Sequence, residues 1–95
     1  MNNETKFIWD ESKRKSNLEK HGLDFEISPQ VFDDQNAKTR QDNRTDYGEE
    51  RYLTFGIVGS LRLCLCWTPR SGKIRVISLF IVNKKDWETE YEQDD

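Results

Sequence analysis

Apolar and polar residues alternate over residues 52–58 and again over 61–67, which is the spacing of strands that place successive side chains on opposite faces. Gly59-Ser60 between the two runs is typical of a two-residue hairpin turn. The first strand is expected to direct Leu53, Phe55 and Ile57 to one face. The core side of the second strand is expected to carry Leu61, Leu63, Leu65 and Trp67.

A second turn at Pro69-Arg70-Ser71-Gly72 leads into residues 73–82, whose β-branched content predicts a third long strand. Residues 84–92 are predicted to close the chain as a helix around Trp87 and Tyr91. Residues 33–50 are polar throughout and are predicted to be loop, except that 37–41 are compatible with an edge strand.

The N-terminal part begins with a short apolar run at residues 7–9, which predicts an edge strand. Asp10 is then a suitable N-cap for a helix that runs to about His21. Gly22 is placed to end this helix in the left-handed conformation. The helix has few apolar residues apart from Leu18, so it is expected to lie on the outside of the domain.

A second helix is expected within residues 24–32, and two starting points are compatible with the sequence. With Asp24 as the cap, Pro29 falls inside the helix and distorts its first turn. With Ser28 as the cap, Pro29 takes the first helical position and the helix is short.

The element order β-α-α-β-β-β-β-α predicts an α+β fold with an antiparallel sheet, two N-terminal helices and one C-terminal helix. The 95 residues suffice for one domain, 1–95, in which the acidic tail 92–95 is expected to be disordered. No stretch approaches the roughly 20 apolar residues that cross a bilayer, and the first residues have no apolar signal core. A cytoplasmic protein without a membrane partner is therefore expected.

Charge is strongly segregated although the formal net charge is only −3. Residues 51–85 contain seven basic and no acidic residues, whereas residues 86–95 contain six acidic and no basic ones. This separation predicts a cationic sheet surface. The alternative is that the basic residues only keep strand edges soluble.

The usual catalytic groups are scarce. Cys64 and Cys66 project to the same face of a strand, and two cysteines do not complete a zinc site, so we expect reduced structural thiols. His21 is the only histidine, and the carboxylates are scattered, so neither a metal nor a cofactor is expected.

Arginines near strand ends remain as candidates, namely Arg51, Arg70 and Arg75. Fixed guanidinium groups can stabilise the negative charge that a phosphodiester gains in its pentacoordinate state. RNA supplies its own nucleophile, the 2′-hydroxyl, so such a site needs only one further group to move a proton. Glu49 or Glu50, beside Arg51, is a candidate for that carboxylate.

Motifs spread over almost the whole chain occur in a characteristic order: Phe7-x-Trp9-Asp10, Lys13, Asn17, Lys20-His21-Gly22, Phe25-Glu26, Phe32-x-Asp34, Gly48-Glu49-x-Arg51, Gly56, Thr68-x-Arg70 and Arg75-Val76-Ile77-Ser78. In this order and spacing they resemble the BrnT toxins, the ribonuclease partners of bacterial type II toxin-antitoxin modules.

The resemblance implies a small RelE-like, microbial-RNase-like fold and an activity that cleaves RNA and halts translation. It also implies a BrnA-like antitoxin with a ribbon-helix-helix part. The toxin-antitoxin complex would contact operator DNA only through this antitoxin. The conserved polar positions of the family correspond to the expected catalytic residues His21, Glu49, Arg51, Arg70 and Arg75. RNA contacts are expected from Lys20, Lys73 and Arg62.

In this interpretation the three arginines hold the scissile phosphate, and Glu49 or His21 handles protons. His21 lies in the last turn of its helix, where the helix dipole favours a cationic ring, so a structural role is the preferred interpretation.

The chain departs from the family after Ile77-Ser78, where family members usually continue with Ala-Arg and this chain has Leu79-Phe80. Loss of an arginine that stabilises transition-state charge is costly for the rate. Two hypotheses follow. The protein is a metal-independent ribonuclease, or it is a catalytically degenerate member that binds an antitoxin and contributes to operon repression. An unrelated RNA-binding sheet protein is disfavoured, because exposed pairs of base-stacking aromatic residues are not evident.

Overall fold

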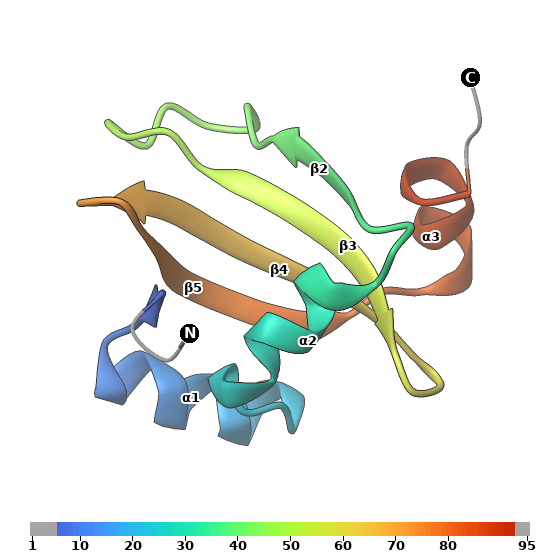
Figure 1. Cartoon of the computed structure of the whole chain (residues 1–95), viewed down its shortest axis with the longest axis horizontal. Helices are drawn as coiled ribbons and strands as arrows, with labels where there is room; N and C mark the ends of the chain where they lie inside the picture. The colour runs from blue at the N-terminus through green and yellow to red at the C-terminus, as the bar shows by residue number, and fades with distance from the viewer. Residues whose placement is uncertain (1–5, 93–95) are drawn as a thin grey trace.

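A computed structural model describes residues 6–92, which form one five-stranded sheet with α-helices against it (Figure 1). The strands lie in the order β1-β5-β4-β3-β2. Their bounds are Phe7–Ile8 (β1), Lys38–Gln41 (β2), Tyr52–Val58 (β3), Leu61–Arg70 (β4) and Lys73–Ile81 (β5). The helices are Glu11–His21 (α1), Ser28–Asp33 (α2) and Lys84–Glu90 (α3), with a 3₁₀ turn over Phe25–Ile27 (η1).

The α+β class is confirmed, but the prediction of an antiparallel sheet is wrong at one pairing. β1 runs parallel to β5, while β2 to β5 pair antiparallel, so the sheet is mixed. Tight turns fix the antiparallel direction of successive strands. β1 and β5 are separated by most of the chain, so no turn determines their relative direction.

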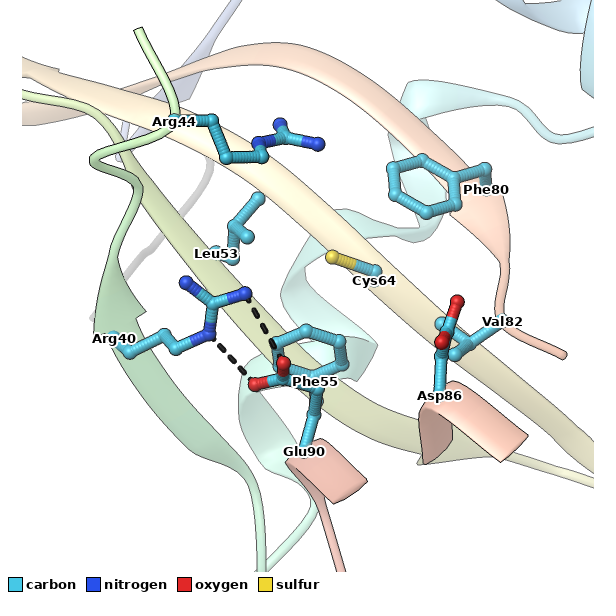
Figure 2. A pocket seen from close by; sticks show the side chains of 9 residues that line it. All are labelled: Arg40, Arg44, Leu53, Phe55, Cys64, Phe80, Val82, Asp86 and Glu90. Atoms are coloured by element: carbon cyan, nitrogen blue, oxygen red, sulfur yellow. Dashed lines mark hydrogen bonds and ion pairs between the residues drawn. The ribbon is translucent and has the colours of Figure 1, made fainter. Parts of the chain in front are cut away.

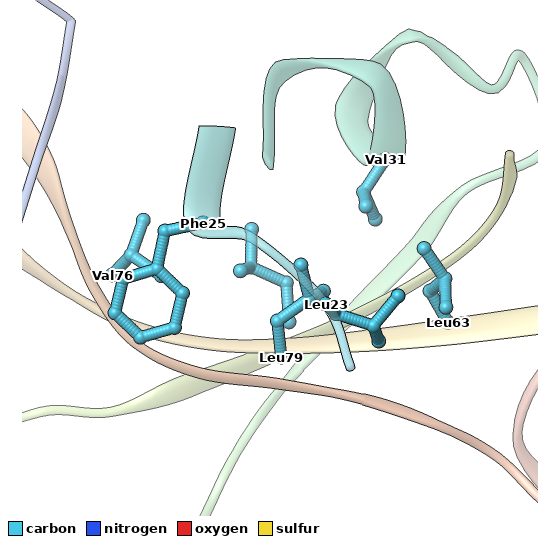
Figure 3. Packing of buried hydrophobic residues seen from close by; sticks show 7 residues of the cluster. Leu23, Phe25, Val31, Leu63, Val76 and Leu79 are labelled. Carbon is cyan, nitrogen blue, oxygen red and sulfur yellow. The ribbon is translucent and has the colours of Figure 1, made fainter. Parts of the chain in front are cut away.

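The sheet has a core on each face, which corrects the prediction of a single core side. One face, called here the helical face, carries Leu63, Leu65, Val76 and Leu79 against Leu23, Phe25 and Val31 (Figure 3). The other, called the open face, carries Leu53, Phe55, Cys64 and Cys66 with Val82 and Trp87. Leu53 and Phe55 therefore lie opposite to Leu63 and Leu65, because they pair directly with Cys66 and Cys64. Leu61 and Ile57, beside the hairpin turn, are exposed.

The predicted ends of α1 are confirmed. The Asp10 carboxylate accepts hydrogen bonds from the Ser12 backbone N–H at 2.9 Å and the Ser12 hydroxyl at 2.8 Å. Gly22 ends the helix with φ of 71°, in the left-handed region. α1 lies along the part of β5 that is not paired with β1. The buried side chain of Asn17 on α1 faces this part of β5.

The two proposed starts of the second helix are both partly realised. Asp24 caps the 3₁₀ turn η1, accepting from the Glu26 N–H at 3.0 Å. α2 then begins at Ser28 with Pro29 in its first turn, and Ile27 rather than Ser28 is the N-cap. An uninterrupted α-helix from Asp24 would place the proline ring against the preceding turn, and the 3₁₀ turn avoids that clash.

α2 packs closely on β3 because Gly56 has no side chain. A Cβ at this position would lie 2.5 Å from the carbonyl oxygen of Val31 and 3.1 Å from its Cγ1. The glycine of the sequence motif is therefore explained by helix-to-strand packing.

The predicted tail 92–95 lies outside the described residues, except for Glu92.

Among residues 6–92, the helices are too short and too polar to span a membrane.

Candidate active site

A bulge in β5 determines which side chains share the open face. Cys66 pairs with Ser78 and Trp67 with Val76, so Ile77 is an extra residue in the ladder. Strict alternation would place Arg75 and Phe80 on opposite faces, since they are five residues apart. The bulge brings both to the open face, where Arg75 pairs with Thr68 and Phe80 with Cys64.

Three arginines surround Thr68 on this face. Arg75 is its partner on β5, and Arg51 lies beside it on the other side, one residue before the Tyr52–Trp67 pair. Neighbouring strands are about 4.8 Å apart, so the backbones of Arg51 and Arg75 are about 10 Å apart. Arg70 is two residues from Thr68 on the same face of β4. Thr68 is buried, and its hydroxyl donates to the carbonyl oxygen of Glu50 at 2.6 Å, which holds β4 to the segment before β3.

Glu49 contacts two of these arginines. Nε of Arg51 donates to its Oε2 at 3.0 Å, and Nη2 of Arg70 lies 3.8 Å from its Oε1. All three side chains remain accessible, with 27%, 32% and 51% exposure for Arg51, Glu49 and Arg70. The carboxylate thus occupies a position between guanidinium groups in which a phosphate would also be stabilised.

The segment before β3 is held in place by a buried carboxylate. Asp42 accepts from Nε of Arg44 at 2.7 Å, from its Nη2 at 2.8 Å and from the Tyr47 hydroxyl at 3.2 Å. These bonds, led by those from Arg44, hold the pKa of Asp42 at about 2 although burial opposes the shift. The Asp42 N–H donates to the carbonyl oxygen of Arg51 at 2.8 Å, so the loop returns to the start of β3.

Tyr47 connects this loop to the arginines. The guanidinium carbon of Arg51 lies 4.1 Å from the centroid of the Tyr47 ring, which is the geometry of a cation–π contact. Arg51 is therefore held by a carboxylate and by an aromatic ring.

Of the other predicted site residues, the structure separates His21, Lys20 and Arg62 from this cluster, but not Lys73. The His21 ring contacts the Phe80 ring, with centroids 5.9 Å apart, and Phe80 is about 16 Å along β5 from Arg75. Lys20 lines a groove of about 190 Å³ between α1 and β5, together with His21. Lys73 pairs with Arg70 and extends the cationic surface. Arg62 is eight residues before Arg70 on β4, about 26 Å away.

Sequence reasoning missed Tyr47 as a site residue, although it is the only aromatic residue of segment 33–50 and directly precedes Gly48-Glu49. The position of Thr68 beside Arg70 could have been predicted, because the spacing Thr68-x-Arg70 places both side chains on one face of a strand. The bulge that brings Arg75 to this face was not predicted from the sequence.

A separate hollow of about 220 Å³ lies on the open face (Figure 2). It combines apolar side chains, two phenylalanine rings among them, with charged side chains at its rim. The residues that line it are Arg40, Arg44, Leu53, Phe55, Cys64, Phe80, Val82, Asp86 and Glu90.

The cysteines lie under this face and are free. Burial raises the pKa of Cys64 to about 12 and also raises the pKa of Cys66, so both are protonated at neutral pH. Within residues 6–92, no three His, Cys, Asp or Glu side chains converge as ligands for a metal ion.

The fold and the site define a small α+β protein whose open sheet face gathers arginines around a carboxylate. The family model of the ribonuclease toxin BrnT of type II toxin-antitoxin systems matches residues 9–86, and the chain belongs to this family. The resemblance inferred from the sequence motifs is thereby confirmed. A comparison with curated proteins finds no match.

Proposed function

We propose that this toxin is a metal-independent endoribonuclease that halts translation and is neutralised in the cytoplasm by a BrnA-like ribbon-helix-helix antitoxin. The observation that carries the proposal is the contact of the Glu49 carboxylate with both Arg51 and Arg70, beside Arg75, on an accessible sheet face. Guanidinium groups in this arrangement supply the fixed positive charge that phosphoryl chemistry requires. We further propose the RelE-like arrangement that the resemblance implies.

In the proposed reaction, the scissile phosphate binds to the guanidinium groups of Arg51, Arg70 and Arg75. The 2′-hydroxyl attacks the adjacent phosphorus while Glu49 accepts its proton. The bond to the 5′-oxygen then breaks, and that oxygen takes up a proton from solvent while Glu49 releases its own to solvent. The products are a 2′,3′-cyclic phosphate and a 5′-hydroxyl end, so no water or oxidant is consumed.

Glu49 is preferred to His21 as the proton acceptor. Glu49 already contacts Arg51 and Arg70, whereas His21 lies beside Phe80, far along β5. A general base must come within hydrogen-bond reach of the proton it removes. We therefore assign His21 a supporting role.

A specific observation favours a second function. The resemblance to the family implies an arginine at the position of Phe80, and its absence lowers the positive charge available to the transition state. The second proposal is a catalytically degenerate toxin that still binds its antitoxin and contributes to operon repression.

One experiment separates the two proposals. Purified protein is incubated with RNA in the presence of a chelator, and the fragments are analysed for cyclic phosphate ends. The first proposal predicts fragments with 2′,3′-cyclic phosphate ends. Intact RNA after incubation with a folded sample would contradict the first proposal. If the protein then also co-purifies with the product of the neighbouring gene, the second proposal is supported.

A further inference from the structure

The hollow beside Phe80 adjoins the arginine cluster. Leu53 lies on its floor, and Arg51 is two residues earlier, just before β3, about 7 Å away along the chain. Arg44 lines the hollow and bonds Asp42, which accepts from Tyr47, the residue that contacts Arg51. The edge of the hollow at Leu53 is therefore close to Arg51, whereas Phe80, which pairs with Cys64, lies two strands away and about 16 Å from the Arg51 backbone.

The lining has the chemistry of a site for a flat aromatic group with polar edges. The floor is apolar, formed by Leu53, Phe55, Cys64 and Val82, and the Phe80 ring forms a wall (Figure 2). At the rim stand the guanidinium groups of Arg40 and Arg44 and the carboxylates of Asp86 and Glu90. Proteins bind unstacked RNA bases on aromatic rings and guanidinium planes, with hydrogen bonds to the base edges.

The rim is also fixed in place. Arg40 donates to both carboxylate oxygens of Glu90, from Nε at 2.6 Å and from Nη2 at 3.2 Å, which ties β2 to α3. Arg44 is held in the same bidentate manner by Asp42. The His21 ring, tilted by 43° to the Phe80 ring, supports it from α1. A site whose walls are held before the ligand arrives loses little freedom on binding.

We propose that this hollow binds a base of the RNA whose phosphate is held by Arg51 and Arg70, at a nucleotide farther along the strand from that phosphate, and that the base stacks on Phe80. The inference rests on the proposed function and adds a base-binding subsite to it.

The test uses two uncleavable RNA probes in which fluorine replaces each 2′-hydroxyl. One probe carries its bases and the other has the same backbone without bases. Binding is measured by fluorescence anisotropy for the wild type, Phe80→Ala and Phe80→Leu, with thermal unfolding to verify that each variant is folded. Phe80→Leu keeps an apolar side chain and removes only the ring, and Ile81→Ala, at the exposed neighbouring position of β5, is a matched control.

Both Phe80 variants are expected to lower the affinity for the base-carrying probe by about tenfold and to leave the affinity for the abasic probe unchanged. The inference is overturned if the variants bind both probes as the wild type does, as expected if an antitoxin side chain fills the hollow. An equal loss for both probes would also overturn it.

A further variant separates this inference from the proposed function. Arg51→Ala should weaken the binding of both probes, because it removes a phosphate contact. If Arg51→Ala weakens both while the Phe80 variants change neither, the base subsite fails and the phosphate site stands. If Arg51→Ala changes neither, the proposed phosphate site fails and the base subsite falls with it.

Discussion

Arg51 lies with its guanidinium carbon 4.1 Å from the centroid of the Tyr47 ring, while its Nε donates to Glu49. Tyr47 is thus positioned to fix the orientation of an arginine that we place at the scissile phosphate. An exposed cation–π contact is worth about 0.5–1 kcal/mol, so its loss has a modest effect on the rate.

Tyr47→Ala is expected to lower the rate of RNA cleavage by about two- to fivefold, as measured in single-turnover assays. Tyr47→Phe keeps the ring and loses only the hydroxyl that donates to Asp42, so its rate should remain close to that of the wild type. Equal losses in the two variants would show that the hydroxyl, and not the ring, positions Arg51.

Asp42 makes the stability of the fold depend on pH at the acidic end. Its folded-state pKa of about 2 lies below the ordinary value of 3.8, so the folded state favours the charged carboxylate. The resulting stabilisation, on the order of 1–2 kcal/mol, is fully present above about pH 4 and is lost as the pH falls from about 4 to 2.

Asp42→Asn should therefore be less stable than the wild type at pH 7, and the difference in unfolding free energy should shrink between pH 4 and pH 2. Urea unfolding of both proteins at several pH values measures this difference. A constant difference over the whole range would contradict the assignment of the low pKa to Asp42.

Asn17 substitutes for a strand partner at the edge of β5. Its Nδ2 donates to the carbonyl oxygen of Leu79 at 2.9 Å, and its Oδ1 accepts from the Leu79 N–H at 3.0 Å. The same Nδ2 also donates to the carbonyl oxygen of Leu23 at 3.1 Å. Asn17 is 6% exposed, so its removal leaves buried backbone groups without these bonds.

Asn17→Ala is expected to lower the free energy of unfolding by about 2–4 kcal/mol, measured by urea denaturation. Ser16→Ala, at an exposed neighbouring position of α1, is the matched control and should change stability by less than about 0.5 kcal/mol. Similar stabilities of the two variants would show that α1 does not hold the edge of β5 through Asn17.

Local signals in the sequence predicted the elements well. Asp10 and Gly22 mark the ends of α1, and Gly59-Ser60 marks the β3–β4 hairpin, because capping and turn formation depend on residues close in sequence. The faces of the sheet were harder to predict. Alternation defines which side chains share a face, but not which face a helix from elsewhere in the chain covers.

The site was predictable to a similar extent. Glu49, Arg51 and Arg70 were selected from motifs, and the structure brings them together through the pairing of β3 with β4. The position of Arg75 on the same face depends on the bulge at Ile77, and Tyr47 reaches Arg51 only through the folded loop. Both features arise from tertiary packing, which a pattern of residue types does not encode.

The central claim is that the arginines around Thr68, and not positive charge in general, carry the cleavage of RNA. The most direct test compares single-turnover cleavage of one RNA, in chelator, by Arg51→Ala and by Arg14→Ala. Both variants remove one arginine that pairs with a carboxylate, but only Arg51 contacts Glu49. The account predicts a loss of about 10²–10³ in rate for Arg51→Ala and a rate near that of the wild type for Arg14→Ala. Equal rates for the two variants would contradict it.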